Sequence, residues 1–454
     1  MSTASPPSPP APTRPRFTRI VRAPEGAGSR SAPSALPGDS LAWQLLLAAR
    51  AIAAVRAGRS LTEGLQTFGG EPPATRAAVA DIAYGTLRRY GWGDFMLGRL
   101  LQKALPHPEA HALLLASLHR LETWPADRHT VVDQAVAAAG EIAGGAFRGL
   151  VNGVLRNYLR QHDALAAAAA DDVVAAWQHP RWWIDKLRRA WPADWQAVLA
   201  AGNAPPPMTL RVNRRLATPA DYRARLAALG IEARPLGESG LRLVRPVAVD
   251  ALPDFATGAV SVQDAGAQRA AELLDPAPGS RVLDACAAPG GKTAHLLERG
   301  ENLDLLALDI DGVRTARIED TLRRLGLRAS VRVADCATVD AWWDGRPFDA
   351  ILADVPCSAS GVVRRHPDSK WLRRESDIRR FARTQAAILD ALWPLLRPGG
   401  RLLYATCSVF PEENAGQIDA FRVRQPGAVR LHETQLLPCD DHDGFYYALL
   451  QKSA

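Results

Sequence analysis

The chain has 454 residues, of which 47% are hydrophobic, and a formal net charge of +7 with a pI near 9.4. Its length exceeds one ordinary core, so we expect two or three domains, and its positive charge favours a polyanionic partner. The sequence lacks a long apolar run, a secretory signal and closely spaced cysteines, which argues against a membrane span, secretion and a metal site, and we expect a monomeric cytoplasmic protein.

Residues 1–38 are rich in Pro, Ser and Ala, with five arginines and one acid. Such a segment buries too little apolar surface to offset the entropy lost on ordering, so we predict a disordered tail. Residues 39–163 instead carry a helical pattern throughout, and we expect an all-α domain there.

The last helix expected in this domain has two different faces. An apolar stripe runs from Phe147 to Tyr158, and Arg148, Asn152 and Arg156 recur every four residues on the other side. A polar face of this kind is usual for a solvated helix, and in a basic protein it also suits nucleic acid. We therefore predict that Arg148 and Arg156 bind RNA.

Residues 176–258 predict a small α+β module. Its strand and helix patterns fall at 208–213, 219–229 and 241–249. The stretches 179–189 and 207–215 mix aromatic and basic residues, which can stack on unpaired bases and track phosphate. The alternative is that Trp182 and Trp183 belong to the core.

From residue 259 to 454 strands and helices alternate, which predicts an α/β domain with a parallel sheet. The expected strands are 281–285, 303–309, 330–334, 348–353, 401–406 and 445–450, and the expected helices are 264–274, 292–299, 312–325 and 383–396. Ligands of such sheets bind beyond the carboxyl ends of the strands. Acidic residues and cysteines stand at those ends.

The first of these strands leads into a small-residue loop before a helix. The loop residues are Cys286, Ala287, Ala288, Pro289, Gly290, Gly291 and Lys292. Their spacing matches neither the phosphate-binding loop, which needs Gly at position 286, nor the dinucleotide fingerprint. A ligand with a ribose and a charged tail but no polyphosphate remains, and we predict S-adenosyl-L-methionine. Asp309 lies 19 residues after Gly290, about the separation at which doubly wound folds place a ribose-binding carboxylate, so we predict that it binds the ribose.

Two cysteines indicate the chemistry. Cys357 closes the sequence Asp354-Val-Pro-Cys, and Cys407 ends a later strand. C5 of cytosine is a poor nucleophile, but a thiolate that adds to C6, with a proton held at N3, makes C5 able to attack a methyl sulfonium. A base must then remove the C5 proton. One thiol would attack, Asp354 would serve N3, and the other thiol would assist release.

The α/β part resembles the Sun (Fmu) family of RNA cytosine-C5 methyltransferases. The matching motifs are Cys286–Lys292, Asp309, Asp335, Asp354–Gly361, Arg364–Trp371, Ala405–Ser408 and Asp443–Tyr446. The helical part, through Asp133–Val136 and Val151–Arg156, resembles the RNA-binding domain of the antitermination factor NusB. Together they resemble the RsmB family.

This resemblance implies a class I (Rossmann-like) methyltransferase domain that holds S-adenosyl-L-methionine through residues 286–292, Asp309, Asp335 and Asp354. It also implies that Cys407 is the nucleophile, that Cys357 assists release, and that the substrate is 16S ribosomal RNA, with cytosine 967 as the target of this enzyme type. Val355 and Cys336 depart from the usual motif residues. Cys286, Cys336 and Cys439 are expected to be mainly structural.

The basic segment 364–374 follows the Cys357 loop, where RNA should enter. We predict that Arg364, Arg365 and Lys370 grip phosphate and help to hold the target base out of its stack. The alternative is a loop that only packs on the domain.

Two other functions stay open. One is a transfer-RNA methyltransferase with the same chemistry, against which the NusB-like domain argues. The other is a non-catalytic RNA-binding assembly factor, against which the intact Cys357, Cys407 and Asp354 argue.

Overall fold

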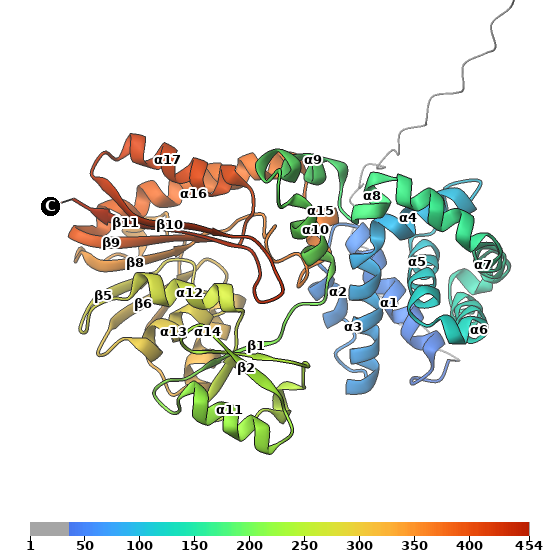
Figure 1. Ribbon diagram of the computed structural model, residues 1–454, viewed down its shortest axis with the longest axis horizontal. Helices are drawn as coiled ribbons and strands as arrows, with labels where there is room; N and C mark the ends of the chain where they lie inside the picture. The colour runs from blue at the N-terminus through green and yellow to red at the C-terminus, as the bar shows by residue number, and fades with distance from the viewer. Residues whose placement is uncertain (1–35, 454) are drawn as a thin grey trace, which may run out of the picture.

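The computed structural model describes residues 36–453. The predicted disordered tail, residues 1–38, lies outside this range except for its last three residues. The described chain forms an all-helical part, a small sheet with one long helix, and a larger sheet between two layers of helices (Figure 1). No helix within residues 36–453 has the length and apolar character needed to cross a membrane.

The N-terminal part is helical, as predicted. Its helices are α1 (Leu41–Arg56), α2 (Leu61–Gln66), α3 (Pro73–Arg88), α4 (Tyr90–Leu100), α5 (Pro108–Thr123), α6 (Arg128–Gly140), α7 (Arg148–Asp171) and α8 (Val173–Trp177). Ser40 caps α1 by accepting the Trp43 N–H (3.2 Å). Helix α1 packs against α3, α5 and α6 and is buried along most of its length, because it is apolar on nearly all sides.

Two helices lead to the small module, α9 (Arg181–Ala190) and α10 (Trp195–Asn203). The module contains β1 (Thr209–Val212), α11 (Pro219–Ala228), β2 (Ala233–Leu236), β3 (Gly240–Leu243) and β4 (Val260–Val262). Its antiparallel strands run in the order β2-β3-β1-β4. Strand β4 thus lies in the small sheet although it follows the predicted boundary at residue 258.

The third part carries a seven-stranded sheet in the order β10-β11-β9-β8-β5-β6-β7. Its strands are β5 (Arg281–Asp284), β6 (Asp304–Asp309), β7 (Ser330–Val333), β8 (Phe348–Asp354), β9 (Leu396–Thr406), β10 (Ala428–Leu436) and β11 (Phe445–Lys452). Strands β7, β6, β5, β8 and β9 are parallel, and β11 and β10 add an antiparallel edge.

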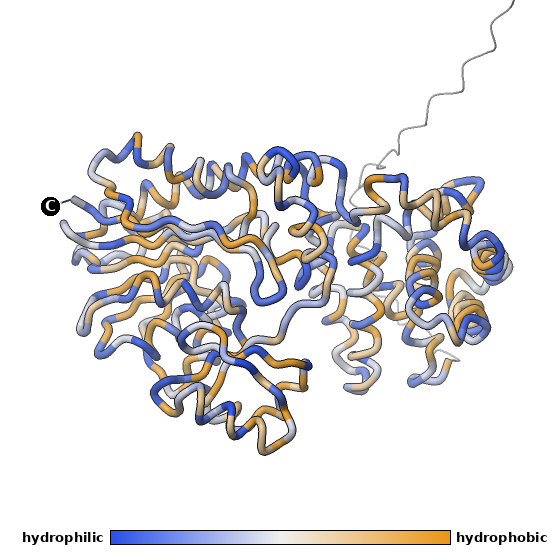
Figure 2. The backbone as a smooth tube through the Cα atoms, viewed as in Figure 1, coloured by the Kyte–Doolittle hydropathy of each residue, from blue (hydrophilic) through white to orange (hydrophobic). Residues whose placement is uncertain are grey.

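Helices cover both faces of this sheet. On one face lie α12 (Ala265–Leu274), α13 (Gly291–Arg299) and α14 (Gly312–Arg324), and on the other lie α16 (Glu375–Leu392) and α17 (Ala415–Arg424). The strands between them are the most hydrophobic part of this domain (Figure 2). The short α15 (Ser369–Leu372) lies outside these layers, next to the helical part. The predicted α/β fold is confirmed.

Buried polar contacts join the small module to the large sheet. Arg211 of β1 is 1% exposed and donates through Nε and Nη2 to both carboxylate oxygens of Glu298 on α13 (2.8 and 2.7 Å). Its Nη1 reaches the carbonyl of Gly291 at the start of the same helix (2.8 Å). A buried bidentate pair of this kind is costly to break. Together the contacts with Glu298 and Gly291 hold the module against α13.

Candidate active site

The loop between β5 and α13 is anchored to both neighbouring strands. Ala285 N–H donates to the carbonyl of Leu352 (2.9 Å) and Ala287 N–H to that of Leu308 (2.8 Å). Gly290 has a φ of +96°, and a Cβ there would lie 3.0 Å from the backbone of Ile318. Only glycine fits at this position, so the sequence lets the loop fold tightly over α14.

Acidic residues stand at the ends of β6 and β7, the next two strands of the sheet on one side of this loop. Asp309, at the end of β6, is 3% exposed and accepts the N–H groups of Ala288 and Asp311 (both 3.1 Å). Asp335, two residues after β7, is exposed and accepts the N–H of Ala337 (2.9 Å). Both carboxylates line one cavity.

That cavity has a volume of about 530 Å³ and lies at the carboxyl ends of β5, β6, β7 and β8. Its lining residues include Cys286, Ala288, Asp309, Ile310, Arg314, Asp335, Cys336, Asp354, Cys357, Thr384, Ile388 and Cys407. The mixture of apolar walls and a few carboxylates suits a ribose-bearing cofactor of S-adenosylmethionine size. The residues present therefore fit the predicted methyl donor.

Lys292 connects the cofactor loop to the chemistry. From the first turn of α13 its Nζ lies 2.5 Å from Oδ2 of Asp354, at the end of β8. Burial lowers the pKa of Lys292, but the charge and hydrogen bond of Asp354 outweigh this, so the pKa is raised and the ammonium form is favoured. The pair places an ammonium group and a carboxylate side by side next to the cavity.

The two predicted catalytic cysteines meet. Strands β8 and β9 are parallel neighbours with Asp354 opposite Ala405, so Cys357 and Cys407 leave adjacent strand ends. Their Sγ atoms are 3.4 Å apart. The hydrogen bond that Cys357 donates to Cys407, together with burial, raises the pKa of Cys357. Cys357 is therefore favoured as the protonated sulfur of the pair.

A second cysteine pair lies in the same cavity. The Sγ atoms of Cys286 and Cys336 are 3.9 Å apart, although fifty positions separate the two residues in sequence. No local pattern predicts this proximity, because the two cysteines lie on loops that only the sheet brings together. Within residues 36–453 no cluster of three or more His, Cys, Asp or Glu side chains suited to a metal ion is found.

The sequence matches known protein families over most of its length. Family profiles match the chain at residues 271–451 (16S rRNA methyltransferase RsmB/F), 179–250 (RsmF/B-like ferredoxin-like domain) and 44–160 (NusB family). Ribosomal RNA small subunit methyltransferase B of Pseudomonas syringae pv. tomato is 43% identical over 90% of this chain and 97% of that protein. The Pseudomonas putida protein of the same name is 44% identical over 90% of this chain and 98% of its own. The chain belongs to the RsmB family.

The crystal structure of PH0851 also superimposes on this RsmB-family chain, with a TM-score of 0.77 and 22% identity over 92% of this chain and all of that one. At this identity the likeness concerns the fold. The predicted family, the NusB-like part and the methyltransferase domain are confirmed, and the predicted α+β module matches a ferredoxin-like domain. Membership of a methyltransferase family also supports S-adenosyl-L-methionine as the cofactor.

The segment predicted to grip RNA has a different role in this RsmB-family structure. Arg364 is 2% exposed and Lys370 is 0% exposed, so neither side chain reaches a phosphate. Lys370 Nζ donates to the carbonyl of Arg88 (3.2 Å) and to Oδ1 of Asn203 (2.8 Å). Burial holds its pKa well below the ordinary value. The prediction for these two residues was wrong, because both side chains are buried and hydrogen-bonded inside the protein.

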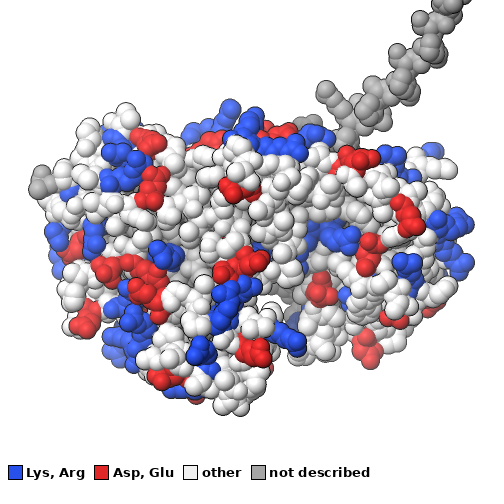
Figure 3. Space-filling view, in the orientation of Figure 1, with Lys and Arg blue, Asp and Glu red and all other residues white. Residues whose placement is uncertain are grey.

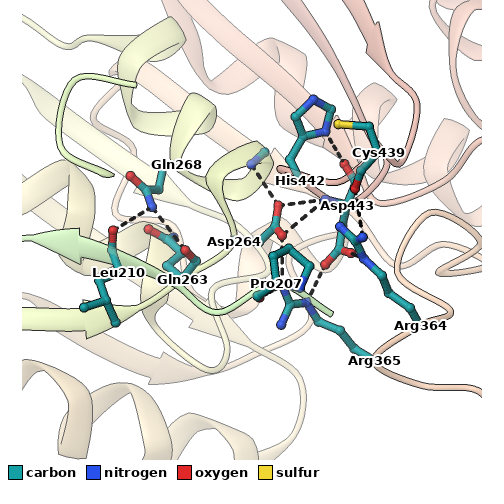
Figure 4. A network of polar contacts seen from close by, with 11 residues as sticks. Pro207, Leu210, Gln263, Asp264, Gln268, Arg364, Arg365, Cys439, His442 and Asp443 are labelled. Carbon is teal, nitrogen blue, oxygen red and sulfur yellow. Dashed lines mark hydrogen bonds and ion pairs between the residues drawn. The ribbon is translucent and has the colours of Figure 1, made fainter. Parts of the chain in front are cut away.

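Arg365 belongs to the same internal network, which Figure 4 shows. Arg364 and Arg365 both donate to the buried carboxylate of Asp443. Arg365 also donates to Asp264 (2.9 Å), which caps α12, and to the carbonyl of Pro207 (3.3 Å). The alternative, a loop that packs on the domain, describes residues 364–371 better. Arg148 and Arg156 on α7 are exposed and stay predicted RNA contacts.

A basic surface beside the cavity was not predicted from the sequence. Helices α9 and α16 share one small core in which Trp183, Leu187, Ile378 and Phe410 pack together. Their outer sides carry exposed arginines, Arg181, Arg188 and Arg189 on α9 and Arg379 and Arg383 on α16, which we call the α9–α16 surface. Figure 3 shows Lys and Arg side chains gathered along this edge of the molecule, with a few acids among them. A search for arginines beside cavity-lining positions of a helix would have found it.

Proposed function

We propose that the protein methylates C5 of one cytosine in 16S ribosomal RNA, with S-adenosyl-L-methionine as methyl donor and a transient bond between Cys407 and C6 of the base. The observation that carries this proposal is the pair of sulfur atoms 3.4 Å apart, beside the Lys292–Asp354 pair and in one cavity. The curated relatives, named for ribosomal RNA small subunit methylation, support the substrate class.

The donor, when bound, supplies a methyl group on a positively charged sulfur. The loop 286–292 with Asp309 and Asp335 would hold its ribose and charged tail. Because these groups lie at the ends of strands rather than on mobile loops, the cofactor would meet a preformed site. The chain's own residues then act on the base.

Cys407 is proposed to attack C6 as a thiolate, which moves the electron pair of the C5–C6 bond towards C5. The Lys292 ammonium would supply a proton through Asp354 to N3, and this proton would stabilise the charge that develops on the ring. Cys357 is proposed to remain protonated meanwhile and to donate a hydrogen bond to the attacking sulfur. After transfer, a solvent water takes the proton from C5 as the base, the C5–C6 double bond re-forms, the N3 proton returns to the Lys292–Asp354 pair and the thiolate of Cys407 departs. Cys357 would assist this last step.

The α9–α16 surface is proposed to guide RNA to the cavity. Thr384 and Ile388 of α16 line the cavity, and Arg383 precedes Thr384 directly. Within the described chain Arg379 and Arg383 have no carboxylate partner, whereas Arg380 pairs with Asp377 (3.1 Å). Unpaired arginines at the mouth of a cavity suit phosphates that flank an extruded base.

The experiment is methyl transfer to protein-free 16S RNA followed by mapping of 5-methylcytosine. We expect one modified position, cytosine 967 by family likeness. Cys407→Ser should lower kcat by at least about 1,000-fold, since it removes the nucleophile. Cys357→Ser should retain attack but slow release, so that a protein–RNA adduct accumulates on denaturing gels. An active Cys407→Ser protein would refute the proposed chemistry.

A further inference from the structure

The residues that follow the two cysteines converge on one buried carboxylate. Ser358 follows Cys357, Ser408 follows Cys407, and both serines are 0% exposed. Between them lies Glu413, also 0% exposed, on the short helix Pro411–Glu413 that precedes α17. None of these three side chains has a role in the proposed reaction, because they do not line the cavity and lie inside the protein.

Glu413 accepts four hydrogen bonds from groups on three segments. Ser358 donates through its backbone N–H to Oε1 (2.8 Å) and through Oγ to Oε2 (2.6 Å). Ser408 Oγ donates to the same Oε2 (2.6 Å), and Gln385 Nε2 of α16 donates to Oε1 (3.3 Å). Four donors match the acceptor capacity of one ionised carboxylate.

The surrounding contacts leave the carboxylate little room to move. Ser360 Oγ lies 3.0 Å from both Ser358 Oγ and Ser408 Oγ and accepts the N–H of Val409 (2.9 Å). Tyr404 donates its hydroxyl to the Glu413 carbonyl (2.7 Å). The two cysteine loops are thus cross-linked behind the sulfurs by one side chain.

The charge of this carboxylate also acts on the thiols. Burial raises the pKa of Glu413, and the hydrogen bonds from Ser358 and Ser408 oppose that rise. Four donors already fill the acceptor positions of an ionised Glu413, and a proton on the carboxyl would compete with one of them. The hydrogen bond with Cys407 and burial are the larger causes of the raised pKa of Cys357. A negative charge on Glu413 raises this pKa further and so favours the protonated thiol.

We propose that Glu413 is the positioning residue that sets the separation and the protonation order of the two catalytic sulfurs. The proposal deepens the proposed function, since it assumes that Cys407 and Cys357 carry the reaction. Glutamine at this position keeps one acceptor oxygen and turns the other into a donor. It therefore cannot receive both serine hydroxyls and the two N–H groups, and one cysteine loop must shift.

The test compares Glu413→Gln with Glu412→Gln, its sequence neighbour. Glu412 is about half exposed and pairs only with Lys186, so its variant is a matched control. In Glu413→Gln we expect kcat to fall about 100-fold, the loss typical of a displacement of about 1 Å, with donor affinity within about twofold of wild type. Glu412→Gln should keep wild-type kcat. A Glu413→Gln kcat within about twofold of wild type would overturn the proposal.

A second measurement needs neither RNA nor methyl donor. In a Cys407→Ala background, the rate of Cys357 alkylation by iodoacetamide is followed against pH by peptide mass spectrometry. Adding Glu413→Gln to this background removes the charge and should move the midpoint of the alkylation rate against pH to lower pH. If Glu413 has only a structural role, the midpoint should stay in place. This readout stays valid even if the protein modifies another RNA, so the two proposals fail separately.

Serine variants cover the case in which Glu413→Gln does not fold. Ser358→Ala and Ser408→Ala each remove one donor and leave the carboxylate in place. Each should lower kcat by about tenfold, with unchanged donor affinity, because each cysteine loop keeps its remaining contacts. Unchanged kcat in both variants would overturn the proposal.

Discussion

At the scale of single residues, the site depends on charges held where water is excluded. Asp284 is the clearest case: it ends β5 beneath the cofactor loop and is 0% exposed. Its Oδ2 accepts the Thr293 hydroxyl (2.6 Å), and within residues 36–453 its Oδ1 has no hydrogen-bond partner. Burial raises the pKa of Asp284 to about 7, against 3.8 for a free side chain.

This shift makes a prediction about stability and pH. Between about pH 4 and pH 7 the folded state keeps a proton that the unfolded state has lost, so rising pH destabilises the fold until the folded pKa is passed. Asp284→Asn removes the titration, and its stability relative to wild type should grow by roughly 1 kcal/mol per pH unit in that window. Urea unfolding of both proteins at pH 5, 6, 7 and 8 measures this. A constant difference between the two would contradict the prediction.

Some residues of the candidate site could be predicted from the sequence, and others could not. Cys357, Cys407 and Asp354 were placed correctly together, because their chemistry requires these residue types at the ends of neighbouring strands. Arg364 and Lys370 were misassigned, because a basic segment has the same sequence pattern whether its charges face phosphate or a buried carboxylate and carbonyl. Burial is a tertiary property that local sequence does not carry.

At the scale of elements, the strong patterns were predicted and the weak ones were missed. All six predicted strands of the large sheet are present, since each is a short apolar run between turn residues. The missed β10 is an edge strand with a mostly exposed first half, and the missed β2 contains Pro235 and two exposed residues. Edge strands need no continuous apolar face, so their sequences resemble loops.

Helix α5 gives a prediction for the helical part. It carries His111 and His119, both 8% exposed, and burial lowers the pKa of each to about 4. Between pH 6.5 and pH 4 the unfolded state binds protons that the folded state excludes, so acid destabilises the fold by up to about 2.7 kcal/mol per pH unit for two sites. The double variant with Gln at both positions should show a smaller loss of stability between pH 7 and pH 5 in urea unfolding. Equal losses would show that other groups control the response.

Helix α16 gives a prediction for RNA binding. Changing Arg379 and Arg383 together to Ala should weaken binding to 16S RNA and reduce the slope of log affinity against log salt by about 1.4, the loss of about two phosphate contacts. The control is Arg323→Ala on α14, an exposed arginine on the opposite face of the sheet. Filter binding at several salt concentrations measures both. An unchanged slope in the double variant would remove α16 from the RNA surface.

At the scale of the whole molecule, the segment after Cys357 joins all parts of the chain. Leu61 N–H donates to the carboxylate of Asp368 (2.9 Å), and Trp371 Nε1 donates to the carbonyl of Leu87 (2.9 Å). The Trp371 ring also lies against Tyr90, with centroids 4.9 Å apart. These partners are nearly 300 positions away in sequence, so no local pattern could have shown them. The same segment follows the Cys357 loop, which ties the placement of the helical part to the candidate active site.

Trp371→Ala should therefore loosen the helical part without altering the chemistry. The change removes an aromatic contact and a hydrogen bond at the junction, a loss of about 2 kcal/mol. Calorimetry should show the helical part unfolding in a separate transition at lower temperature. KM for long 16S RNA should rise several-fold while kcat stays near wild type, because the helical part would bind the RNA but be held less firmly beside the cavity. Trp124→Ala is the control, since Trp124 is 42% exposed on the same helical part and contacts Arg120 rather than the methyltransferase domain. A single transition at the wild-type temperature in Trp371→Ala would mean that the remaining contacts of Asp368 and Lys370 hold the parts together without it.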